Sequence, residues 1–240
     1  MRYAIFSDIH GNLPAFEAIL EDMNGQDVQK HFCLGDIVGY GAYPDECVSL
    51  VRALGCHTVA GNHDYAVLGK ISTRHFNKMA KKSTLWTRDT LRAESLEFLD
   101  SLTLVEKFGD VSLVHGSLHS PELFDYIQNS YDAYLSLTRT PGRLCFVGHS
   151  HIPVAFVQDP FITYSLDQTI EVPEEGKVLV NVGSVGQPRD KNPYACYAIY
   201  DDQDGKVTIR RQPYDVEKAI EAIQDRGLPT VLGERLRYGR

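Results

Sequence analysis

Two residue types that bind metals or transfer protons follow the first apolar run of the chain. Asp8 and His10 come directly after Tyr3 to Phe6, a run that reads as a short buried strand. A spacing of two places both side chains on one face of an extended segment, so a carboxylate oxygen and an imidazole nitrogen can reach the same point. The pair alone is equally compatible with a helix-capping aspartate and an ordinary loop histidine, because short motifs also arise by chance.

Polar side chains of the same kind follow four further short apolar runs. The complete set is Asp8, His10, Asp36, Asn62, His63, His115, His149 and His151. The strands of one sheet bring their ends together, and ligands of open α/β sheets bind beyond the carboxyl ends of strands, so we expect a single site. The mixture of oxygen and nitrogen donors suits Mn, Fe, Zn or Ni better than Mg or Ca.

Strands and helices that would position this site alternate in the first part of the chain. Strands are predicted at residues 3–6, 31–34 and 58–60, and helices at 13–23 and 44–54. This alternation is typical of a parallel sheet with crossover helices. Beyond it, the pattern predicts two helical pieces within 74–100, a strand pair at 102–105 and 111–114, a helix at 130–137 and a strand at 144–147.

The last third of the chain has a different pattern. Strands predicted at residues 154–157, 178–182, 194–200 and 207–211 follow one another without helices, which indicates a second sheet that is antiparallel or mixed. An amphipathic helix is predicted at 215–225. The tail that follows carries Arg235, Arg237 and Arg240, which we expect to be solvated. We expect a single domain over residues 1–240, with a C-terminal helical tail from about residue 215.

Composition limits the function classes. The 240 residues carry a formal net charge of −8 without a basic block, which disfavours general binding to nucleic acids or membrane surfaces. A bound metal can invert the local field, so a small phosphorylated substrate remains compatible. The five cysteines are odd in number and lack C-x-x-C spacing, as in reduced intracellular proteins. No apolar stretch has the length of a signal-peptide core or a membrane span, so we expect a cytoplasmic protein.

Five blocks of this sequence resemble the motifs of the calcineurin-like metallophosphoesterase superfamily. The family pattern is D-x-H, G-D, G-N-H-[DE], H-G and G-H-x-H, and the chain carries these blocks in order at residues 8–10, 35–36, 61–64, 115–116 and 148–151. The sequence is most similar to small bacterial and archaeal phosphoesterases related to diadenosine tetraphosphatase. Their G-D-x-V-G-Y-G and N-x-G-S-x-G-Q-P-R segments match residues 35–41 and 181–189.

The resemblance implies a four-layer α/β/β/α sandwich of two mixed sheets flanked by helices. One sheet would be mostly parallel and the other would come largely from the last third. The implied activity is phosphoester hydrolysis by a hydroxide that bridges two divalent or trivalent transition-metal ions, with manganese expected in vitro. The implied ligands are Asp8, His10 and His151 for the first metal, Asn62, His115 and His149 for the second, and Asp36 for both. Two divalent ions and two carboxylates leave about +2 at the site, which attracts a phosphate.

The resemblance also gives His63 a role beside the metals, facing the leaving oxygen as a proton or hydrogen-bond donor. The alternatives for His63 are a further metal ligand or a packed core histidine. The neighbouring Asp64 either orients His63 or caps a turn, and the turn is favoured. His31, His57, His75 and His119 fit no motif position and are expected at the surface or in packing.

One branch of the family differs from this chain. Ser/Thr protein phosphatases carry G-D-x-x-D-R-G, whereas Gly39 and Tyr40 stand here in place of the Asp and Arg. Protein phosphatase activity is therefore disfavoured, and another residue should hold the phosphate. Arg189 is the candidate, because arginine grips phosphate through two parallel hydrogen bonds; the competing reading is a structural loop. Tyr40 either lines the pocket or only packs.

The sequence does not choose the substrate. A phosphomonoester, a phosphodiester such as a cyclic nucleotide, and a dinucleoside polyphosphate all fit, because selectivity lies in the rim of the site. The alternative of another class is a catalytically inactive metal-binding scaffold, which is disfavoured because every ligand position is filled. The expected partner is a small phosphorylated substrate, and a homo-oligomer is compatible with the sequence.

Overall fold

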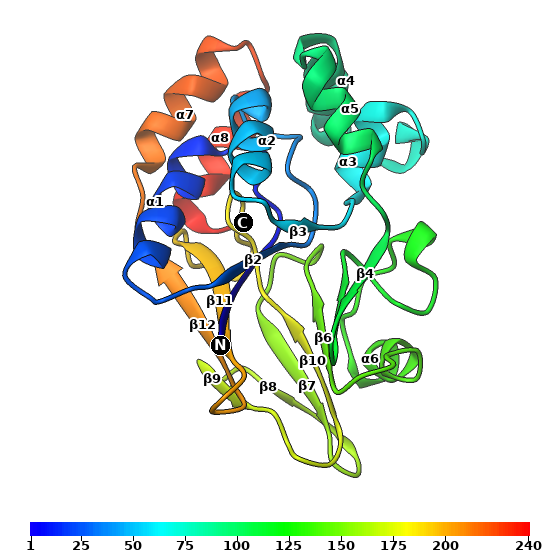
Figure 1. Ribbon diagram of the computed structural model, residues 1–240. Helices are drawn as coiled ribbons and strands as arrows, with labels where there is room; N and C mark the ends of the chain where they lie inside the picture. The colour runs from blue at the N-terminus through cyan, green and yellow to red at the C-terminus, as the bar shows by residue number, and fades with distance from the viewer.

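The computed structural model describes residues 1–240 and contains two six-stranded mixed sheets between layers of helices (Figure 1). The first sheet has the strand order β3-β2-β1-β11-β12-β9. Its strands are β1 (Arg2–Phe6), β2 (Lys30–Cys33), β3 (His57–Thr58), β9 (Thr169–Glu171), β11 (Ala195–Asp201) and β12 (Lys206–Gln212). The strands β1, β2 and β3 are parallel, and β11 pairs antiparallel with β1.

The second sheet has the strand order β4-β5-β6-β10-β7-β8. Its strands are β4 (Val105–Phe108), β5 (Val111–Val114), β6 (Leu144–Val147), β7 (Val154–Gln158), β8 (Ile162–Ser165) and β10 (Lys177–Asn181). The central strands β5, β6 and β10 are parallel, and the outer pairs are antiparallel.

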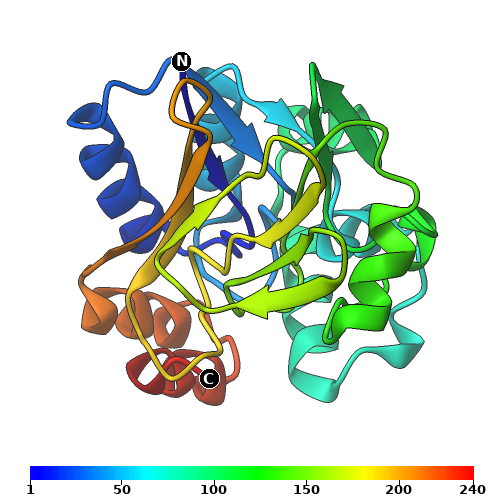
Figure 2. The same cartoon turned by 90° about the horizontal axis from the view of Figure 1, so that it is seen from below.

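The helices cover the outer faces of the two sheets. They are α1 (Leu13–Asn24), α2 (Pro44–Ala53), α3 (Asn62–Leu68), α4 (Lys78–Thr90), α5 (Ala93–Asp100), α6 (Ser130–Leu137), α7 (Val216–Asp225) and α8 (Thr230–Glu234), with short 3-10 turns at Thr73–His75, Pro121–Leu123 and Arg235–Tyr238. Figure 2 shows α1 and α6 on opposite sides of the two sheets. The predicted four-layer α/β/β/α sandwich is therefore confirmed. Its helices lack the length and apolar content that crossing a bilayer requires.

Strand β1 shows why the layers form. Its side chains alternate between the two faces of the sheet. Ala4 and Phe6 pack with residues of α1 and α2, such as Phe16 and Val48, whereas Ile5 faces the second sheet. Because both faces are buried, the strand reads as a continuous apolar run, as expected for a strand covered on both sides.

The prediction for the last third of the chain was wrong in one respect. This part does not form a sheet of its own; it contributes β9, β11 and β12 to the first sheet and β7, β8 and β10 to the second. The strands β8 and β9 were not predicted, because they are short and largely exposed and lack an apolar run. Strand β4 begins at Val105, so it lies further along the chain than predicted. Pairing between strands distant in sequence leaves no periodic signal within either strand.

A charge-assisted contact ties α1 to the first sheet. The guanidinium of Arg210 donates two hydrogen bonds, of 2.7 and 2.8 Å, to Asp22, and the Tyr197 hydroxyl also donates to this carboxylate. Arg210 and Tyr197 together hold the pKa of Asp22 below its usual range, against the opposing effect of burial. The contact fixes the C-terminal half of α1, the helix that follows the Asp8 and His10 loop.

Asp22→Asn is expected to lower the free energy of unfolding by about 1 kcal/mol at pH 7, since the lost bonds are charge-assisted but the carboxylate still touches solvent. Because the folded-state pKa lies below the unfolded one, this contribution is complete above about pH 4 and disappears as the pH falls through the folded pKa. Urea denaturation of both proteins at pH 7 and pH 3 measures the difference. An equal difference at both pH values would contradict the assignment.

Candidate metal centre

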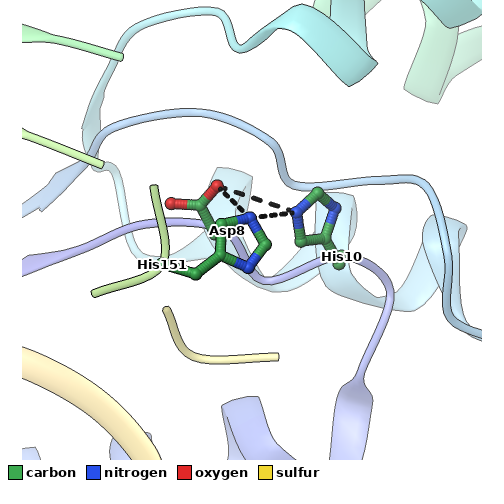
Figure 3. Close-up of side chains that lie close together, drawn as sticks. All are labelled: Asp8, His10 and His151. Carbon is green, nitrogen blue, oxygen red and sulfur yellow. Dashed lines mark hydrogen bonds and ion pairs between the residues drawn. The ribbon is translucent and has the colours of Figure 1, made fainter. Parts of the chain in front are cut away.

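The polar residues singled out in the sequence lie together where the strands of both sheets end. Asp8 and His10 follow β1, Asp36 follows β2, and Asn62 and His63 open α3 after β3. His115 follows β5, and His149 and His151 follow β6 in the second sheet. The expectation that one sheet supplies the whole set was therefore wrong, because the site is built by both sheets. Figure 3 shows Asp8 and His10, from the loop after β1, converging with His151 from the loop after β6.

The backbone at this site adopts an uncommon conformation. The φ angles of Asp8, His10, Asp36, His149 and His151 are 55°, 51°, 51°, 66° and 61°, in the left-handed region that residues other than glycine rarely adopt. Hydrogen bonds between the loops hold them there, such as His10 N–H to the Asp36 carbonyl at 3.0 Å. Such strained residues cluster at functional sites, where the surrounding structure fixes them.

Both aspartates have one satisfied and one unsatisfied oxygen. The Oδ2 of Asp8 accepts the His149 N–H at 3.0 Å, and the Oδ1 of Asp36 accepts the His63 N–H at 2.7 Å. The opposite oxygens, Asp8 Oδ1 and Asp36 Oδ2, are buried and have no hydrogen-bond donor. An uncompensated buried carboxylate oxygen is costly, so a cation in the cluster would stabilise both.

Hydrogen bonds to the backbone orient three of the imidazole rings. Their Nδ1 atoms donate to backbone carbonyls: His10 to Val38 at 3.0 Å, His115 to Leu34 at 2.8 Å and His151 to Gln187 at 2.6 Å. These bonds fix the tautomer, so the Nε2 lone pairs point into the cluster. The same support orients metal-binding histidines generally. The donor set therefore fits metal ions, and it consists of two carboxylates, several neutral imidazoles and the Asn62 amide oxygen.

The ligand atoms form two groups. In the first, the Nε2 of His151 lies 3.1 Å from Asp8 Oδ1 and 3.2 Å from His10 Nε2 (Figure 3). In the second, the Nε2 of His115 lies 3.1 Å from His149 Nδ1 and 3.2 Å from Asn62 Oδ1. The Nε2 lone pairs of His10 and His151 repel each other at this distance unless a cation lies between them. Two ligand atoms that each lie about 2.1 Å from one metal ion, at nearly a right angle to each other, are roughly 3 Å apart. The observed spacings match this distance.

Asp36 lies between the two groups. Its unpartnered Oδ2 is 3.7 Å from His10 Nε2 in the first group and 3.3 Å from His115 Nε2 in the second. The free oxygen of Asp8, Oδ1, also approaches the second group, but it lies 4.0 Å from His115 Nε2. Asp36 Oδ2 therefore lies closer to the second group than Asp8 Oδ1 does. The position is the one that a carboxylate shared by two cations requires.

The pKa values of the buried histidines and of Asp8 are also compatible with a bound cation. Burial lowers the pKa of His149 to about 3 and that of His151 to about 4, so both rings are neutral at pH 7. Burial opposes ionisation of Asp8, but the surrounding histidines hold its pKa well below the usual range. Burial likewise opposes a charge on His115, yet the Asp36 carboxylate raises the His115 pKa to about 9. The cluster therefore favours positive charge beside Asp36.

His63 lies beside the two groups. Its ring packs against His10, Tyr40 and Phe76, with centroid distances of 4.9, 4.5 and 4.8 Å, and its Nδ1 is buried without a partner. A Cβ atom on Gly39, whose φ is +88°, would lie 2.5 Å from this Nδ1. The ring therefore occupies the space that a side chain at position 39 would need, and no carboxylate supports His63 from there.

Asp64 caps a turn, as the sequence favoured. Its carboxylate accepts N–H bonds from Gly61, Asp36, Ile37 and Val38 at 2.9, 2.8, 3.0 and 3.3 Å. These bonds fasten the loop after β2 to the start of α3, so Asp64 positions Asp36 through the backbone. Burial and the neighbouring Asp36 carboxylate raise the pKa of Asp64 to about 7, although the N–H donors oppose that rise.

Arg189 and Tyr40 lie at the rim of the first group. The Arg189 N–H donates to the His151 carbonyl at 3.2 Å, and its guanidinium lies 6.0 Å from the centre of the Tyr40 ring. The guanidinium donates to Gln187 Oε1 at 3.0 Å, while its Nε is buried without a partner. Tyr40 is buried against His10 and His63. The guanidinium has no carboxylate partner and is therefore available to an anion.

Two residues near the site had not been identified from the sequence. Tyr126 stacks on His149 with a centroid distance of 3.9 Å and an angle of 16°. Arg235 was expected to be solvated, but it is half-buried near Arg189 and Tyr40, and burial and Arg189 lower its pKa. The tail is held there by the Lys191 N–H, which donates to the Gly239 carbonyl at 2.9 Å. Neither residue belongs to a motif, so only the tertiary structure reveals them.

The remaining histidines lie outside the cluster. His57 pairs with Glu106 at 2.6 Å, His31 is half-buried, and His75 and His119 are exposed. The other two tail arginines are exposed, and Arg237 pairs with Glu217. The five cysteines are free thiols, four of them buried.

Comparisons with known proteins agree with this geometry. A family model described as the calcineurin-like phosphoesterase superfamily domain matches residues 1–205. An uncharacterized protein of Methanocaldococcus jannaschii is 45% identical over 241 residues, covering 99% of this chain and 98% of that protein. The crystal structure of a metallophosphoesterase from Sphaerobacter thermophilus is 40% identical, with a TM-score of 0.89, and the match covers 100% of this chain and 99% of that one. A hypothetical protein from Pyrococcus horikoshii OT3 shares the fold at 22% identity, with a TM-score of 0.80 and coverage of 100% and 98%.

Proposed function

Since this chain belongs to the calcineurin-like phosphoesterase superfamily, we propose that its buried Asp and His cluster binds two transition-metal ions and uses them to hydrolyse its substrate. Phosphoester hydrolysis is the activity of the family and of this chain.

Two ligand groups share one carboxylate in the proposed centre. Asp8, His10 and His151 would hold the first ion, Asn62, His115 and His149 would hold the second, and Asp36 would contact both. The observation that carries this assignment is the pair of buried, unpartnered oxygens, Asp8 Oδ1 and Asp36 Oδ2, which face imidazole nitrogens whose N–H groups already point elsewhere. Imidazole and carboxylate donors favour Mn, Fe, Zn or Ni, with manganese as the expected metal in vitro.

The metal ions and the side chains around them have different roles in the proposed reaction. The bound ions supply Lewis acidity, which lowers the pKa of a water and neutralises charge on the phosphoryl oxygens. Arg189 binds a further phosphoryl oxygen through its guanidinium, and Tyr40 holds His10 and His63 in place. His63 donates a proton or hydrogen bond to the leaving oxygen, and it is the side chain we assign as general acid. The substrate is a small phosphorylated molecule, and the free thiols favour a reducing compartment such as the cytoplasm.

Elemental analysis of the purified protein, coupled to a phosphate-release screen, tests the proposal. The screen covers nucleotides and sugar phosphates with added Mn²⁺. We expect two metal ions per chain and hydrolysis that a chelator abolishes and Mn²⁺ restores. A protein that turns over substrate fully after exhaustive chelation would refute the metal-dependent assignment.

Arg189→Gln is expected to raise KM about tenfold or more with a smaller change in kcat. The reason is that the substrate loses the charge-assisted hydrogen bonds from the guanidinium to its phosphoryl oxygen. Arg189→Lys should recover only part of this loss, since an ammonium is a point charge without the planar fork. Arg237→Gln is the matched control, because Arg237 is exposed on the tail and pairs with Glu217. Steady-state kinetics measure all three. An unchanged KM in Arg189→Gln would assign Arg189 to the structure of the loop alone.

A further inference from the structure

Two clefts adjoin the candidate metal centre. The first, which we name the His63 cleft, has a volume of 450 Å³, and its lining includes His63, His149 and Phe76. The second, which we name the Arg189 cleft, has a volume of 720 Å³, and its lining includes Arg189, Ser150 and Tyr164. Both volumes lie within the range that accommodates small organic groups.

Tyr126 separates the two clefts and lines both of them. Its ring is stacked on His149, and the loop that follows β6 passes between the clefts, with His149 in the first and Ser150 in the second. Arg189 is anchored to the same loop through the His151 carbonyl. The two clefts therefore adjoin at Tyr126 and the loop after β6, beside the candidate ligand His149.

The Arg189 cleft has an apolar wall that is open to water. It is formed by Ile152, Val154, Phe156, Tyr164 and Leu166, which come from β7, β8 and their flanking residues. Tyr164 is 68% exposed and Leu166 is 72% exposed. Exposed apolar groups at this density commonly mark a binding groove. The wall lines the same cleft as Arg189 and Tyr126. A group bound against it would therefore lie beside the guanidinium that we assign to the phosphate.

The His63 cleft has a mixed lining. Apolar Ile71, Phe76, Leu123 and Phe124 lie in it beside polar residues such as Asn77. A leaving group that takes a proton from His63 must lie in this cleft. The Arg189 cleft is then left for a second substituent on the same phosphorus.

We propose that the substrate is a linear phosphodiester whose two organic groups occupy the two clefts, the leaving group beside His63 and the retained group in the Arg189 cleft. This inference rests on the proposed function and specifies its substrate class. Water adds to phosphorus and loses one proton, and the bond from phosphorus to the leaving oxygen breaks. The leaving oxygen takes a proton from His63, and the proton lost by the water restores His63. The products are one alcohol and one phosphomonoester. A monoester fills only one cleft, and the two ester oxygens of a cyclic nucleotide belong to one ring.

The kinetic test compares bis-p-nitrophenyl phosphate with p-nitrophenyl phosphate on the metal-loaded protein. We expect kcat/KM to be about tenfold or more higher for the diester, because a second aryl group becomes buried. Tyr164→Ala and Leu166→Ser should each lower the ratio of diester to monoester kcat/KM about fivefold. Phe161→Ala is the matched control, because Phe161 is 81% exposed on the turn of the same hairpin and does not line the cleft.

The binding test uses two phosphinates that cannot be hydrolysed and carry the same charge. In calorimetric titrations, diphenylphosphinate should bind about tenfold more tightly than dimethylphosphinate, and Tyr164→Ala should reduce this difference. If neither ester is hydrolysed, the proposed function fails, while the phosphinate comparison still decides whether the clefts bind two aryl groups.

Three results would overturn the inference. One is a diester-to-monoester ratio at or below one that Tyr164→Ala leaves unchanged while the monoester is hydrolysed. Another is equal binding of the two phosphinates. The third is a gel-filtration shift in which Leu166→Ser converts a dimer to a monomer without changing the ratio, which would make the apolar wall a contact between two copies of the chain.

Discussion

Asp36→Asn is expected to lower kcat/KM by about 10³-fold and to leave fewer than two metal ions per chain. The amide keeps the size of the carboxylate and can still accept the His63 N–H, so the local backbone should be retained. The amide lacks the negative charge that Asp36 supplies to both groups of ligands. Metal binding is then weaker, and the transition state loses several kcal/mol of stabilisation by the metal ions. Elemental analysis and steady-state kinetics of the same preparation measure both effects.

Asp110→Asn provides the control for this variant, since Asp110 is an exposed carboxylate that pairs with Arg143 at the end of the second sheet remote from the cluster. It should bind two metals and turn over like the unchanged protein. Full activity and full metal content in Asp36→Asn would show that the two groups of ligands do not depend on a shared carboxylate.

His63→Gln is expected to lower kcat by about 10² to 10⁴-fold while the metal content stays unchanged, because a general acid contributes about that factor. The loss should be larger for esters with an alkyl leaving group than for p-nitrophenyl esters, since nitrophenolate leaves without a proton. This dependence on the leaving group separates proton donation from a purely structural effect. A catalytically inactive metal-binding scaffold would show no turnover in either protein.

His75→Gln is the matched control for His63, because both histidines line the His63 cleft but His75 is exposed and outside the cluster. It should retain turnover with both classes of ester. If His63→Gln also lost its metals, the alternative reading of His63 as a ligand would replace the general acid; one of its ring nitrogens lies within 4.8 Å of ligand atoms of His10 and Asp36.

The sequence predicted the local parts of this architecture well. Each of the five motif blocks combines a short apolar strand with the polar residues that follow it, so strand ends and candidate ligands could be read together. Asp64 shows the same point, because a carboxylate three residues after Gly61 is a local turn signal. The alternation of strands and helices likewise indicated parallel strands early in the chain.

The sequence could not show which strands pair with one another. The strands of the last third divide between two sheets because β11 pairs with β1 and β10 pairs with β6, and such long-range pairing leaves no mark on either strand alone. Tyr126 and Arg235 were missed for the same reason. Tyr126 lies outside any helix or strand and reaches His149 only through the folding of the loop after β5, and Arg235 approaches Arg189 only because the tail docks on the Lys191 loop.

Anomalous scattering from crystals of the manganese-loaded protein would locate the bound ions. We expect two peaks about 3.5–4 Å apart, with Asp36 in contact with both, Asp8, His10 and His151 around one, and Asn62, His115 and His149 around the other. A single peak, or two peaks that do not share Asp36, would contradict this expectation.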